Sequence, residues 1–431
     1  MSTQALPGFR DFYPEEMALR THIFSTWRRV ASSYGFEEFD GPPLESLELF
    51  TAKSGQEIVG QLYAFEDKGG RSVALRPEVT PTLARMVAAR ANALKKPIRW
   101  FTISQLFRYE RQQRGRLREH FQLNCDILGE PGPVGDAEII ALSLDAMRAF
   151  GLTHTDVRAR ISDRRVLEIL LRGAGIADQH LPAAHQAVDK VERVDRERLA
   201  GMLAGQGLTS SAVDAVFRVA EIREWDTLAD ALRGVPGGSE VGQPLRTALD
   251  ALEAMGLGAF IDVDLSIVRG LDYYTGIVFE LFDASKALRA ICGGGRYDNL
   301  LSALGGVDLP AIGFGMGDVV LGELLMDRGL APPPTPSVDV FLAGATDDDL
   351  PHLLGLAHAL REHGIRVEYS FRAAALRKQL RLADSRGARY AVVMGPDERE
   401  RGEVTLKTLS DGSQRAVARD AIVADVIRLL A

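Results

Sequence analysis

The chain has 431 residues, of which 46% are hydrophobic and 26% are charged, and its formal net charge is −8. This length exceeds one ordinary hydrophobic core and predicts at least two domains, while the negative charge excludes a wholly basic nucleic-acid binder but allows local basic patches. Two cysteines, Cys125 and Cys292, exclude a disulfide framework and a structural zinc site of ordinary spacing. The N-terminus has no signal-peptide pattern and no apolar run reaches about 18 residues, so we expect a cytoplasmic protein without a membrane segment.

Residues 1–326 predict an α+β domain. Apolar residues at helical spacing predict a helix from about Glu15 to Tyr34. Several strand candidates then follow one another without an intervening helix, which favours antiparallel pairing. Their ranges are 62–67, 72–78, 98–110, 121–130, 157–162, 261–267 and 276–283. Between about 165 and 256 the sequence turns helical, with a predicted loop at 235–244, and we expect a helical insertion over roughly 175–256.

Residues 327–337 predict a linker. Prolines at four of the five positions from Pro332 to Pro336 exclude a helix and favour an extended chain. Beyond it, residues 338–431 alternate predicted strands and helices, which indicates a small α/β domain with a mostly parallel sheet. Within that domain, residues 361–389 carry eight basic against three acidic residues. Such a patch suits RNA phosphates, although an ordinary solvated face accounts for any single arginine.

The segment "LFRYERQQRGRLREHFQLNCD" (106–126) concentrates arginine between two apolar flanks and predicts a strand–loop–strand hairpin around Gly115. Strand alternation puts Arg108 and Glu110 on one face. A guanidinium group there could bind phosphate or carboxylate through two parallel hydrogen bonds. A solvated basic hairpin is an equally good reading of composition alone.

In "VALRPEVTPTLAR" (73–85), Glu78 and Thr80 share one face just before a predicted helix. A carboxylate and a hydroxyl placed in this way could bind an ammonium group. The alternative is a helix-capping device in which Thr80 precedes Pro81.

Two later segments combine glycine, arginine and tyrosine. In "IVRGLDYYTGIVFELF" (267–282), Arg269 could reach a phosphate and Tyr274 could present a hydroxyl, although aromatic core packing explains the tyrosines equally well. In "ICGGGRYDNLLSALGG" (291–306), three consecutive glycines allow a ligand to approach the backbone closely, but no Lys-Ser/Thr follows as in a Walker loop.

Together these segments resemble class II aminoacyl-tRNA synthetases, and within them the histidyl-tRNA synthetase family, over nearly the whole chain. The similar segments are "GFRDFYPEE", "LRPEVT", "FRYERQQRGRLREHFQ", "RGLDYYTGIVFE", "GGGRYD" and the motif 1 candidate "GPPLESLELF" (41–50). The resemblance implies an antiparallel-sheet catalytic core with a helical insertion, followed by a C-terminal α/β anticodon-binding domain.

The resemblance also implies an activity and its partners. L-histidine would react with ATP and Mg²⁺ to give histidyl-adenylate, the histidine would pass to tRNA(His), and motif 1 would build a homodimer. The alternative is a catalytically silent paralogue, such as the regulatory subunit of ATP phosphoribosyltransferase, which resembles the core but generally lacks the anticodon domain.

Site residues carried over from the family divide into three groups. The catalytic residues are Arg269 and Arg108, at the reacting phosphate. The histidine-binding residues are Glu78, Val79, Thr80, Arg108, Gln122, Asp126, Arg269, Tyr273, Tyr274 and Tyr297. The ATP-binding residues are Arg108, Glu110, Arg116, Gly313 and Gly315. No protein metal ligand is implied, because Mg²⁺ would bridge the ATP phosphates.

In two places motif 2 and its surroundings depart from the family pattern. Asp126 stands where the family usually has glutamate, so a shorter side chain must reach the imidazole. The order "REHFQ" leaves both His120 and Phe121 as candidates for the ring that stacks on adenine.

The segment "AIGFGMGDVVLGELL" (311–325) predicts a strand that leads into a helix and corresponds to motif 3. Val319 and Val320 occupy the positions of the usual Glu-Arg pair, so the arginine that would contact adenine and the γ-phosphate is missing. We expect other arginines, in particular Arg116, to carry part of the phosphate charge. These variants resemble the plant-organelle-like branch of the family.

Overall fold

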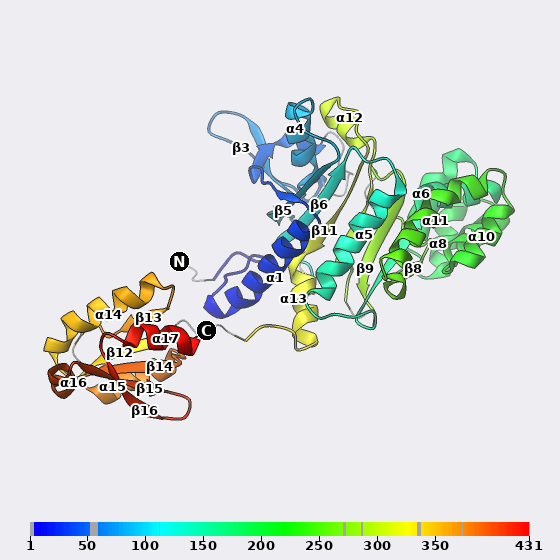
Figure 1. Ribbon diagram of the computed structural model, residues 1–431. Coiled ribbons are helices and arrows are strands. Elements are labelled where there is room, and N and C mark those ends of the chain that lie inside the picture. The colour runs from blue at the N-terminus through cyan, green and yellow to red at the C-terminus, as the bar shows by residue number, and fades with distance from the viewer. Residues whose placement is uncertain are drawn as a thin grey trace. The chain divides into compact units, whose positions relative to one another are not determined.

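The protein forms two compact units, Met1–Pro332 and Pro333–Ala431, in the computed structural model (Figure 1). The structure describes residues 4–51, 59–111, 113–269, 273–285, 288–333, 338–372 and 374–430. The predicted linker at 327–337 therefore lies partly outside the described residues, and so do residues 270–272 of the "RGLDYYTG" segment. Each unit has its own hydrophobic core.

An eight-stranded sheet organises the first unit. Its order is β1 (Glu37–Glu38), β5 (Ile98–Phe107), β6 (Glu119–Leu128), β11 (Ala311–Gly317), β10 (Cys292–Arg296), β9 (Ile277–Asp283), β7 (Val157–Asp163) and β8 (Ile261–Val263). Neighbouring strands are antiparallel except at the two edges, where β1 pairs with β5 and β8 pairs with β7 in parallel. The predicted α+β class is confirmed.

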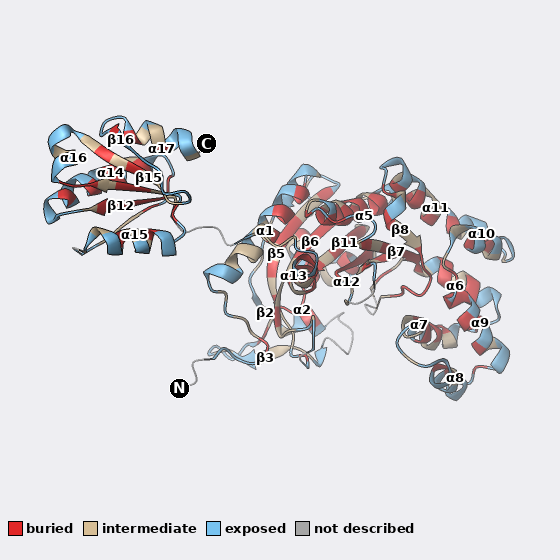
Figure 2. Cartoon of the chain, turned by 90° about the horizontal axis from the view of Figure 1, so that it is seen from below, coloured by how far each residue is buried: buried red, intermediate tan, exposed pale blue. Residues whose placement is uncertain are grey.

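Three helices pack on one side of this sheet: α1 (Pro14–Ser33), α5 (Pro133–Arg148) and α13 (Asp318–Asp327). Figure 2 shows the central strands and α5 in the colour of buried residues. The sequence pattern did not predict α5. Eleven of its residues are buried and apolar residues surround much of its circumference, so the one-sided periodicity that identifies a surface helix is weak.

A smaller three-stranded sheet stands beside the main one, in the order β2 (Leu44–Ser46), β4 (Ser72–Leu75) and β3 (Tyr63–Glu66). The short helix α2 (Leu47–Thr51) packs on β4, and α4 (Thr80–Arg90) packs against α12 (Leu300–Gly305). Between these helices and the main sheet lies a separate apolar cluster that includes Leu83, Val278 and the rings of Tyr274 and Tyr297. This cluster forms the floor on which two of the predicted site tyrosines rest.

A group of helices joins β7 to β8, as the sequence predicts (Figure 1). The helices are α6 (Arg164–Gly173), η1 (Asp178–His180), α7 (Leu181–Asp189), α8 (Arg196–Gly205), α9 (Ser210–Ala220), α10 (Trp225–Arg233), α11 (Gly238–Ala254) and η2 (Gly258–Phe260). The predicted loop at 235–244 is wrong beyond Gly237, because α11 begins at Gly238 and contains Pro244. Gly242 packs closely against the side chain of Leu232, so tertiary packing overrides the weak helix propensity of glycine and proline.

The second unit contains a five-stranded sheet in the order β13 (Val367–Tyr369), β12 (Val340–Gly344), β14 (Tyr390–Met394), β15 (Glu403–Thr408) and β16 (Gln414–Ala418). Two of its ladders are parallel and two are antiparallel, so the sheet is mixed rather than mostly parallel. The helices of this unit are η3 (Asp347–Asp349), α14 (Leu350–Glu362), α15 (Leu376–Ser385), α16 (Pro396–Arg401) and α17 (Ile422–Leu430).

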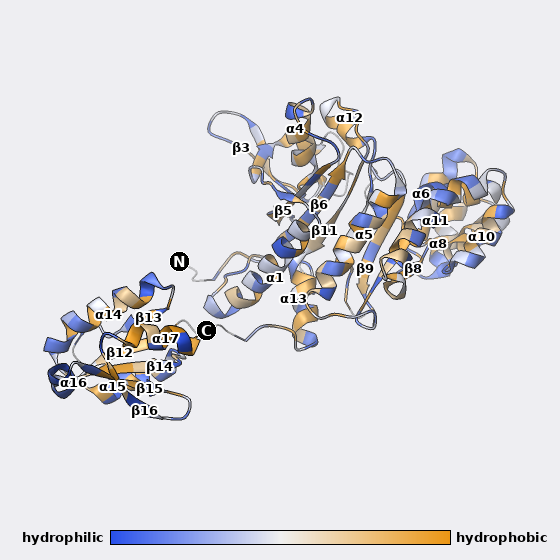
Figure 3. Cartoon of the chain, viewed as in Figure 1, coloured by the Kyte–Doolittle hydropathy of each residue, from blue (hydrophilic) through white to orange (hydrophobic). Residues whose placement is uncertain are grey.

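Apolar segments coincide with buried ones. Figure 3 shows β9 and α13 in the hydrophobic colour, and most residues of both elements are buried. In the described part of the chain, no helix is both long and apolar enough to cross a membrane.

Candidate active site

A small cavity of about 60 Å³ lies on the face of the main sheet opposite α1, α5 and α13. Its lining is Glu78, Thr80, Arg108, Gln122, Asn124, Asp126, Arg269, Tyr273, Tyr274, Gly293, Tyr297, Gly313, Phe314 and Gly315. Eleven of these residues belong to the set assigned from the sequence. Asn124, Gly293 and Phe314 were not assigned. Asn124 could have been found from the sequence, because it lies on the same face of β6 as Gln122 and Asp126.

Two tyrosine hydroxyls donate to two carboxylates in the cavity. Tyr273 Oη donates to Glu78 Oε2 at 3.2 Å, and Tyr297 Oη donates to Asp126 Oδ1. The rings of Tyr273 and Tyr297 meet edge to face with centroids 5.8 Å apart. The two hydrogen bonds therefore connect segments that are far apart in sequence. They lie beside the apolar cluster between α4, α12 and the main sheet.

Three polar atoms of residues that line the cavity lack a hydrogen-bond partner among the described residues. They are Asn124 Oδ1, Asp126 Oδ2 and Arg269 Nε. Burial raises the pKa of Asp126 to about 7, while the Tyr297 hydroxyl opposes this by stabilising the carboxylate. An unpaired buried polar atom costs free energy, and a ligand with matching donors and acceptors would remove that cost. The cavity thus offers two acceptors and one cationic donor.

Gly313 and Gly315 provide space for side chains of the neighbouring strand. Gly313 lies opposite Asp126 in the β6–β11 ladder, and a Cβ at this position would collide with Asp126 Oδ1. A Cβ at Gly315 would lie 2.7 Å from Cδ of Gln122. Glycine is required at both positions so that the side chains of Gln122 and Asp126 can lie across β11. This requirement holds whether or not Gly313 and Gly315 also contact ATP.

Arg269 is held in an unusual backbone conformation. Its φ of +62° lies in the left-handed region, which costs free energy for a residue with a side chain. Nη1 donates to Glu280 Oε1 at 2.5 Å, and the guanidinium lies across Gly293, where no side chain would fit. Burial alone would lower the pKa of Arg269, but the charge of Glu280 and the Tyr274 hydroxyl hold it above its ordinary value. The guanidinium is therefore a fixed cation at the cavity.

The β5–β6 hairpin is present with the predicted antiparallel pairing. Arg108 and Glu110 do not share a strand face, however, because β5 ends at Phe107 and both residues lie in the connecting loop. Arg108 Nε donates to the carbonyl of Pro77 at 2.9 Å, which directs the side chain to the cavity. Glu110 Oε2 and Arg116 Nε form an ion pair at 2.9 Å, outside the cavity lining.

The side chains of β6 separate the two candidate rings. Phe121 packs edge to face against Phe12 and Phe24, with centroids 6.3 and 5.1 Å away, on the α1 side of the sheet. His120 has the opposite parity and shares the face of Gln122 and Asp126. Burial, followed by the charges of Arg108 and Arg10, lowers the pKa of His120 to about 3, so the ring is neutral near pH 7. Only His120 of the two is on the side of the site.

The helix-capping alternative at Thr80 is wrong. Helix α4 has Val79 as its N-cap and no side-chain capping hydrogen bond, and Thr80 is the first helical residue. Thr80 instead lines the cavity with Glu78, whereas the Val79 side chain is fully buried.

Asp318, the charge beside the motif 3 glycines, ties three segments together. Its Oδ2 accepts from Arg10 Nη1 at 2.9 Å, and its Oδ1 accepts from the backbone N–H of Phe121 at 2.9 Å. Arg10 also donates to Glu119 at 2.7 Å. Asp318 therefore fixes the start of α13 to β6 and to the N-terminal segment.

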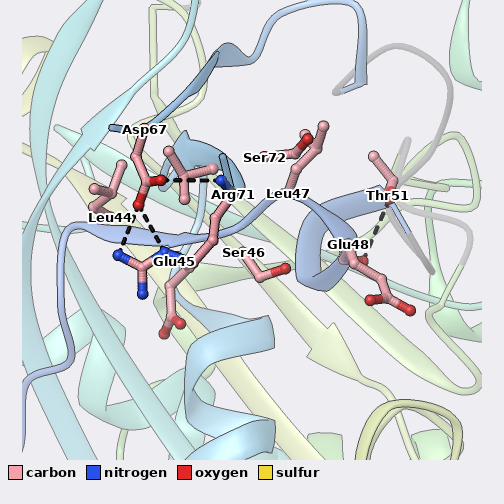
Figure 4. A pocket seen from close by; sticks show the side chains of 10 residues that line it. Leu44, Glu45, Ser46, Leu47, Glu48, Thr51, Asp67, Arg71 and Ser72 are labelled. Atoms are coloured by element: carbon pink, nitrogen blue, oxygen red, sulfur yellow. Dashed lines mark hydrogen bonds and ion pairs between the residues drawn. The ribbon is translucent and has the colours of Figure 1, made fainter. Parts of the chain in front are cut away.

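A larger, open depression of about 680 Å³ lies elsewhere, along β2, β4 and α2 (Figure 4). It contains none of the assigned site residues. Its charged pair, Asp67 and Arg71, is joined by a hydrogen bond of 2.7 Å, which Figure 4 shows. The smaller cavity is the candidate active site, because three unpartnered buried polar atoms belong to residues that line it and none belongs to a described residue of the depression. Among the described residues, no group of three or more His, Cys, Asp and Glu side chains is placed to hold a metal ion.

The second unit carries a separate exposed surface at the start of α15, which we call the α15 basic surface. It consists of Phe371, Arg372, Arg377, Lys378 and Arg381. Phe371 is 86% exposed and meets Tyr369 edge to face at 5.5 Å. The structure gives the four cations no carboxylate partner among the described residues, whereas Arg366 of the same segment pairs with Asp339 at 2.6 Å. An exposed ring beside unpaired cations is suited to stacking and phosphate contact with single-stranded RNA.

Comparison with known proteins places both units. Residues 8–317 match the family model described as histidyl-tRNA synthetase, and residues 339–429 match the anticodon binding domain. A histidine–tRNA ligase of Opitutus terrae is 46% identical over 430 residues, which is 98% of each chain. The chloroplastic/mitochondrial histidine–tRNA ligase of Arabidopsis thaliana is 41% identical over 408 residues, 94% of this chain and 83% of that one. The crystal structure of histidyl-tRNA synthetase from Nostoc sp. PCC 7120 is similar with a TM-score of 0.84 and 27% identity over 99% of each chain.

These matches cover both units and almost the whole length of the chain. By its sequence and its fold, the chain belongs to the histidyl-tRNA synthetase family.

Proposed function

We propose that the chain is a histidine–tRNA ligase that activates L-histidine with ATP and transfers it to tRNA(His). The observation that carries the proposal is the set of unpartnered atoms of Asn124, Asp126 and Arg269 around a cavity that also contains Glu78 and Arg108. An amino acid with an imidazole ring carries a matching ammonium group, carboxylate and ring N–H. Membership of the family and the anticodon-binding domain support the same activity.

Each group of the substrate has a partner in this proposal. Glu78, Thr80 and Gln122 hold the α-ammonium group, and Val79 contributes through the backbone at the same turn. Asp126 accepts the imidazole N–H through Oδ2, while Tyr297 fixes Oδ1. The tyrosine rings then enclose the ligand and exclude water, with Tyr273 held by Glu78.

Activation is an in-line displacement on the α-phosphate. A carboxylate oxygen of histidine forms a bond to phosphorus, the bond to the bridging oxygen breaks, and pyrophosphate leaves with the electron pair. Arg108 and Arg269 neutralise the charge that grows on the α-phosphate oxygens, and Arg269 is already fixed by Glu280 before the substrate arrives. A preorganised cation of this kind stabilises the transition state without a protein nucleophile.

ATP would bind as its magnesium complex, and Mg²⁺ would supply charge neutralisation at the phosphates. We place the adenine ring against His120, which is neutral near pH 7 and lies on the site face. Glu110 and Arg116 contact the nucleotide from the motif 2 loop, where they already form an ion pair. Gly313 and Gly315 lie in the same wall.

Histidine-dependent ATP–pyrophosphate exchange with the purified chain tests the activation step. We expect exchange that requires L-histidine and Mg²⁺. Absence of exchange would instead support the silent regulatory paralogue, for which the replacement of the motif 3 arginine by Val320 is the one favourable observation. The anticodon-binding domain at 339–429 favours the ligase.

The α15 basic surface is proposed to bind the tRNA anticodon. Replacing Phe371 by alanine removes a stacking surface worth roughly 1–3 kcal/mol per base, so we expect KM for tRNA in aminoacylation to rise about 5- to 140-fold. Exchange, which does not need tRNA, should be unchanged. Ile427→Ala serves as a control, because Ile427 is also an exposed apolar side chain of this unit but lies on α17. Equal KM values for the two variants would contradict the proposal.

Two further properties are proposed. Motif 1, whose residues 41–50 include β2 and most of α2, is proposed to build a homodimer, and sedimentation at micromolar concentration distinguishes it from a monomer.

The cytoplasm is proposed as the compartment, because both cysteines are free and buried, which suits a reducing environment.

A further inference from the structure

Position 320, where the family usually has an arginine, carries a valine. Val320 is buried, and its Cγ2 lies 3.2 Å from the point where a Cβ on Gly115 would be. Gly115, with φ of +74°, forms the turn at the tip of the motif 2 loop. The valine therefore closes the α13 side of the loop with an apolar contact and brings no charge.

A different arginine reaches the same point from another strand connection. Arg289 lies between β9 and β10, and its Cδ is 3.7 Å from the same Cβ position on Gly115. Its Nη2 donates to Oε1 of Gln113, at 2.5 Å. The stem of Arg289 and the side chain of Val320 thus both lie against Gly115, and the Arg289 guanidinium lies at the motif 2 loop near Arg116.

The charges around Arg289 do not cancel. Partial burial lowers its pKa, the positive charges of Arg116 and Arg193 lower it further, and Glu110 alone opposes them. Glu110 is already paired with Arg116 at 2.9 Å. No described carboxylate lies within ion-pair distance of Arg289. Neighbouring guanidinium groups that share one carboxylate repel each other, and a polyanion bound between them relieves that repulsion.

We infer that Arg289 and Arg116 together hold the β- and γ-phosphates of ATP. Arg289, in the β9–β10 connection, then replaces the cation that α13 lacks because position 320 is a valine. This inference rests on the proposed function and adds one binding residue to it. As the bond from the α-phosphorus to the bridging oxygen breaks, the leaving pyrophosphate gains charge, and both guanidinium groups neutralise it.

The test compares Arg289→Ala with Arg114→Ala in the full chain. Arg114 lies in the motif 2 loop that Arg289 contacts and is also exposed, but its charge is paired with Glu323 at 2.9 Å, so it serves as the matched control. For Arg289→Ala we expect KM for ATP in exchange to rise on the order of 10- to 100-fold, because a hydrogen bond to a charged group is lost, while KM for histidine stays within about twofold. Arg289→Lys keeps the charge and should lose less.

A third variant separates phosphate binding from loop positioning. Gln113→Ala removes the hydrogen bond that joins Arg289 to the loop but keeps the arginine. We expect KM for ATP to change by less than about threefold in this variant. If Gln113→Ala loses as much as Arg289→Ala, Arg289 acts only through the loop and the inference is overturned.

Calorimetric titration with inorganic pyrophosphate, and separately with AMP, provides a readout that does not need activity. Arg289→Ala should weaken pyrophosphate binding by a similar factor and leave AMP binding unchanged. Equal pyrophosphate affinity in Arg289→Ala and Arg114→Ala would overturn the inference even if the wild type is active. A wild type that binds pyrophosphate through Arg289 but shows no exchange would contradict the proposed function instead, so the two failures are distinguishable.

Discussion

Arg269→Ala is expected to lower the rate of histidine-dependent ATP–pyrophosphate exchange by about 10²–10³-fold, the loss typical when one preorganised donor to a developing anion is removed. Histidine binding, measured by calorimetry without ATP, stays measurable. In the proposed function the two effects separate, because Glu78 and Asp126 would hold the ammonium and imidazole groups while Arg269 would contact the α-phosphate. We expect this to be the largest effect of any single substitution at the site.

The expected size of the effect follows from the position of the Arg269 guanidinium, which is fixed before any substrate binds. Its left-handed backbone, its ion pair with Glu280 and its fit over Gly293 fix the guanidinium in the free protein. Little reorganisation is then needed when charge develops on the α-phosphate. The alanine variant loses the cation and also leaves Glu280 without this partner.

Arg269→Lys is the control for that second effect. Lysine keeps a positive charge near Glu280 but cannot offer the planar fork, so exchange should fall less than in the alanine variant. Thermal unfolding of both variants shows whether the fold persists. Exchange that is undiminished in folded Arg269→Ala would refute the role of this residue.

Local patterns in the sequence predicted much of this architecture. The hairpin around Gly115, the strand that leads into α13 and the helical insertion follow from apolar periodicity and the placement of glycine and proline. The start of α11 was mispredicted because packing against Leu232 decides it, and α5 was missed because it is buried around most of its surface.

The site is harder to predict because its parts are distant in sequence. Asp126 and Tyr297 meet only after β6 and β10 have both paired with β11, and Glu78 joins them from the segment between β4 and α4. No local period contains that information. The resemblance to the family assigned these residues to the site. Residue pattern alone left a functional and a purely structural interpretation open for each segment. The choice between His120 and Phe121 depends on which face of β6 each occupies, and a shift of one residue in register would exchange them.

Glycine has a similar ambiguity. The resemblance implied that Gly313 and Gly315 bind ATP, and the structure shows that both leave space for the side chains of Gln122 and Asp126 on the neighbouring strand. Arg289 could not be predicted either, because its neighbours in the structure are distant from it in sequence. It is 31 residues from Val320 along the chain and meets it only at Gly115.

Histidine affinity is expected to rise as the pH increases through about 7 and then to level off. Burial raises the pKa of Asp126 to about 7, so near neutral pH its two protonation states are similarly populated. Tyr297 occupies Oδ1, which leaves Oδ2 as the atom that either carries the proton or accepts the imidazole N–H. Protonation therefore removes the acceptor, and below the pKa the affinity falls by up to about tenfold per pH unit.

Two substitutions determine whether Asp126 causes this dependence. Asp126→Asn should weaken histidine binding about 10- to 100-fold and remove the step near pH 7, leaving the titration of free histidine near about 6.5. Tyr297→Phe removes a hydrogen bond that stabilises the carboxylate, so the pKa of Asp126 rises and the step moves to higher pH. Calorimetric dissociation constants across the neutral range measure both. Asp126→Asn could keep the wild-type pH dependence of histidine affinity, or Tyr297→Phe could move the step to lower pH. Either result would mean that another group titrates and that Asp126 does not accept the imidazole N–H.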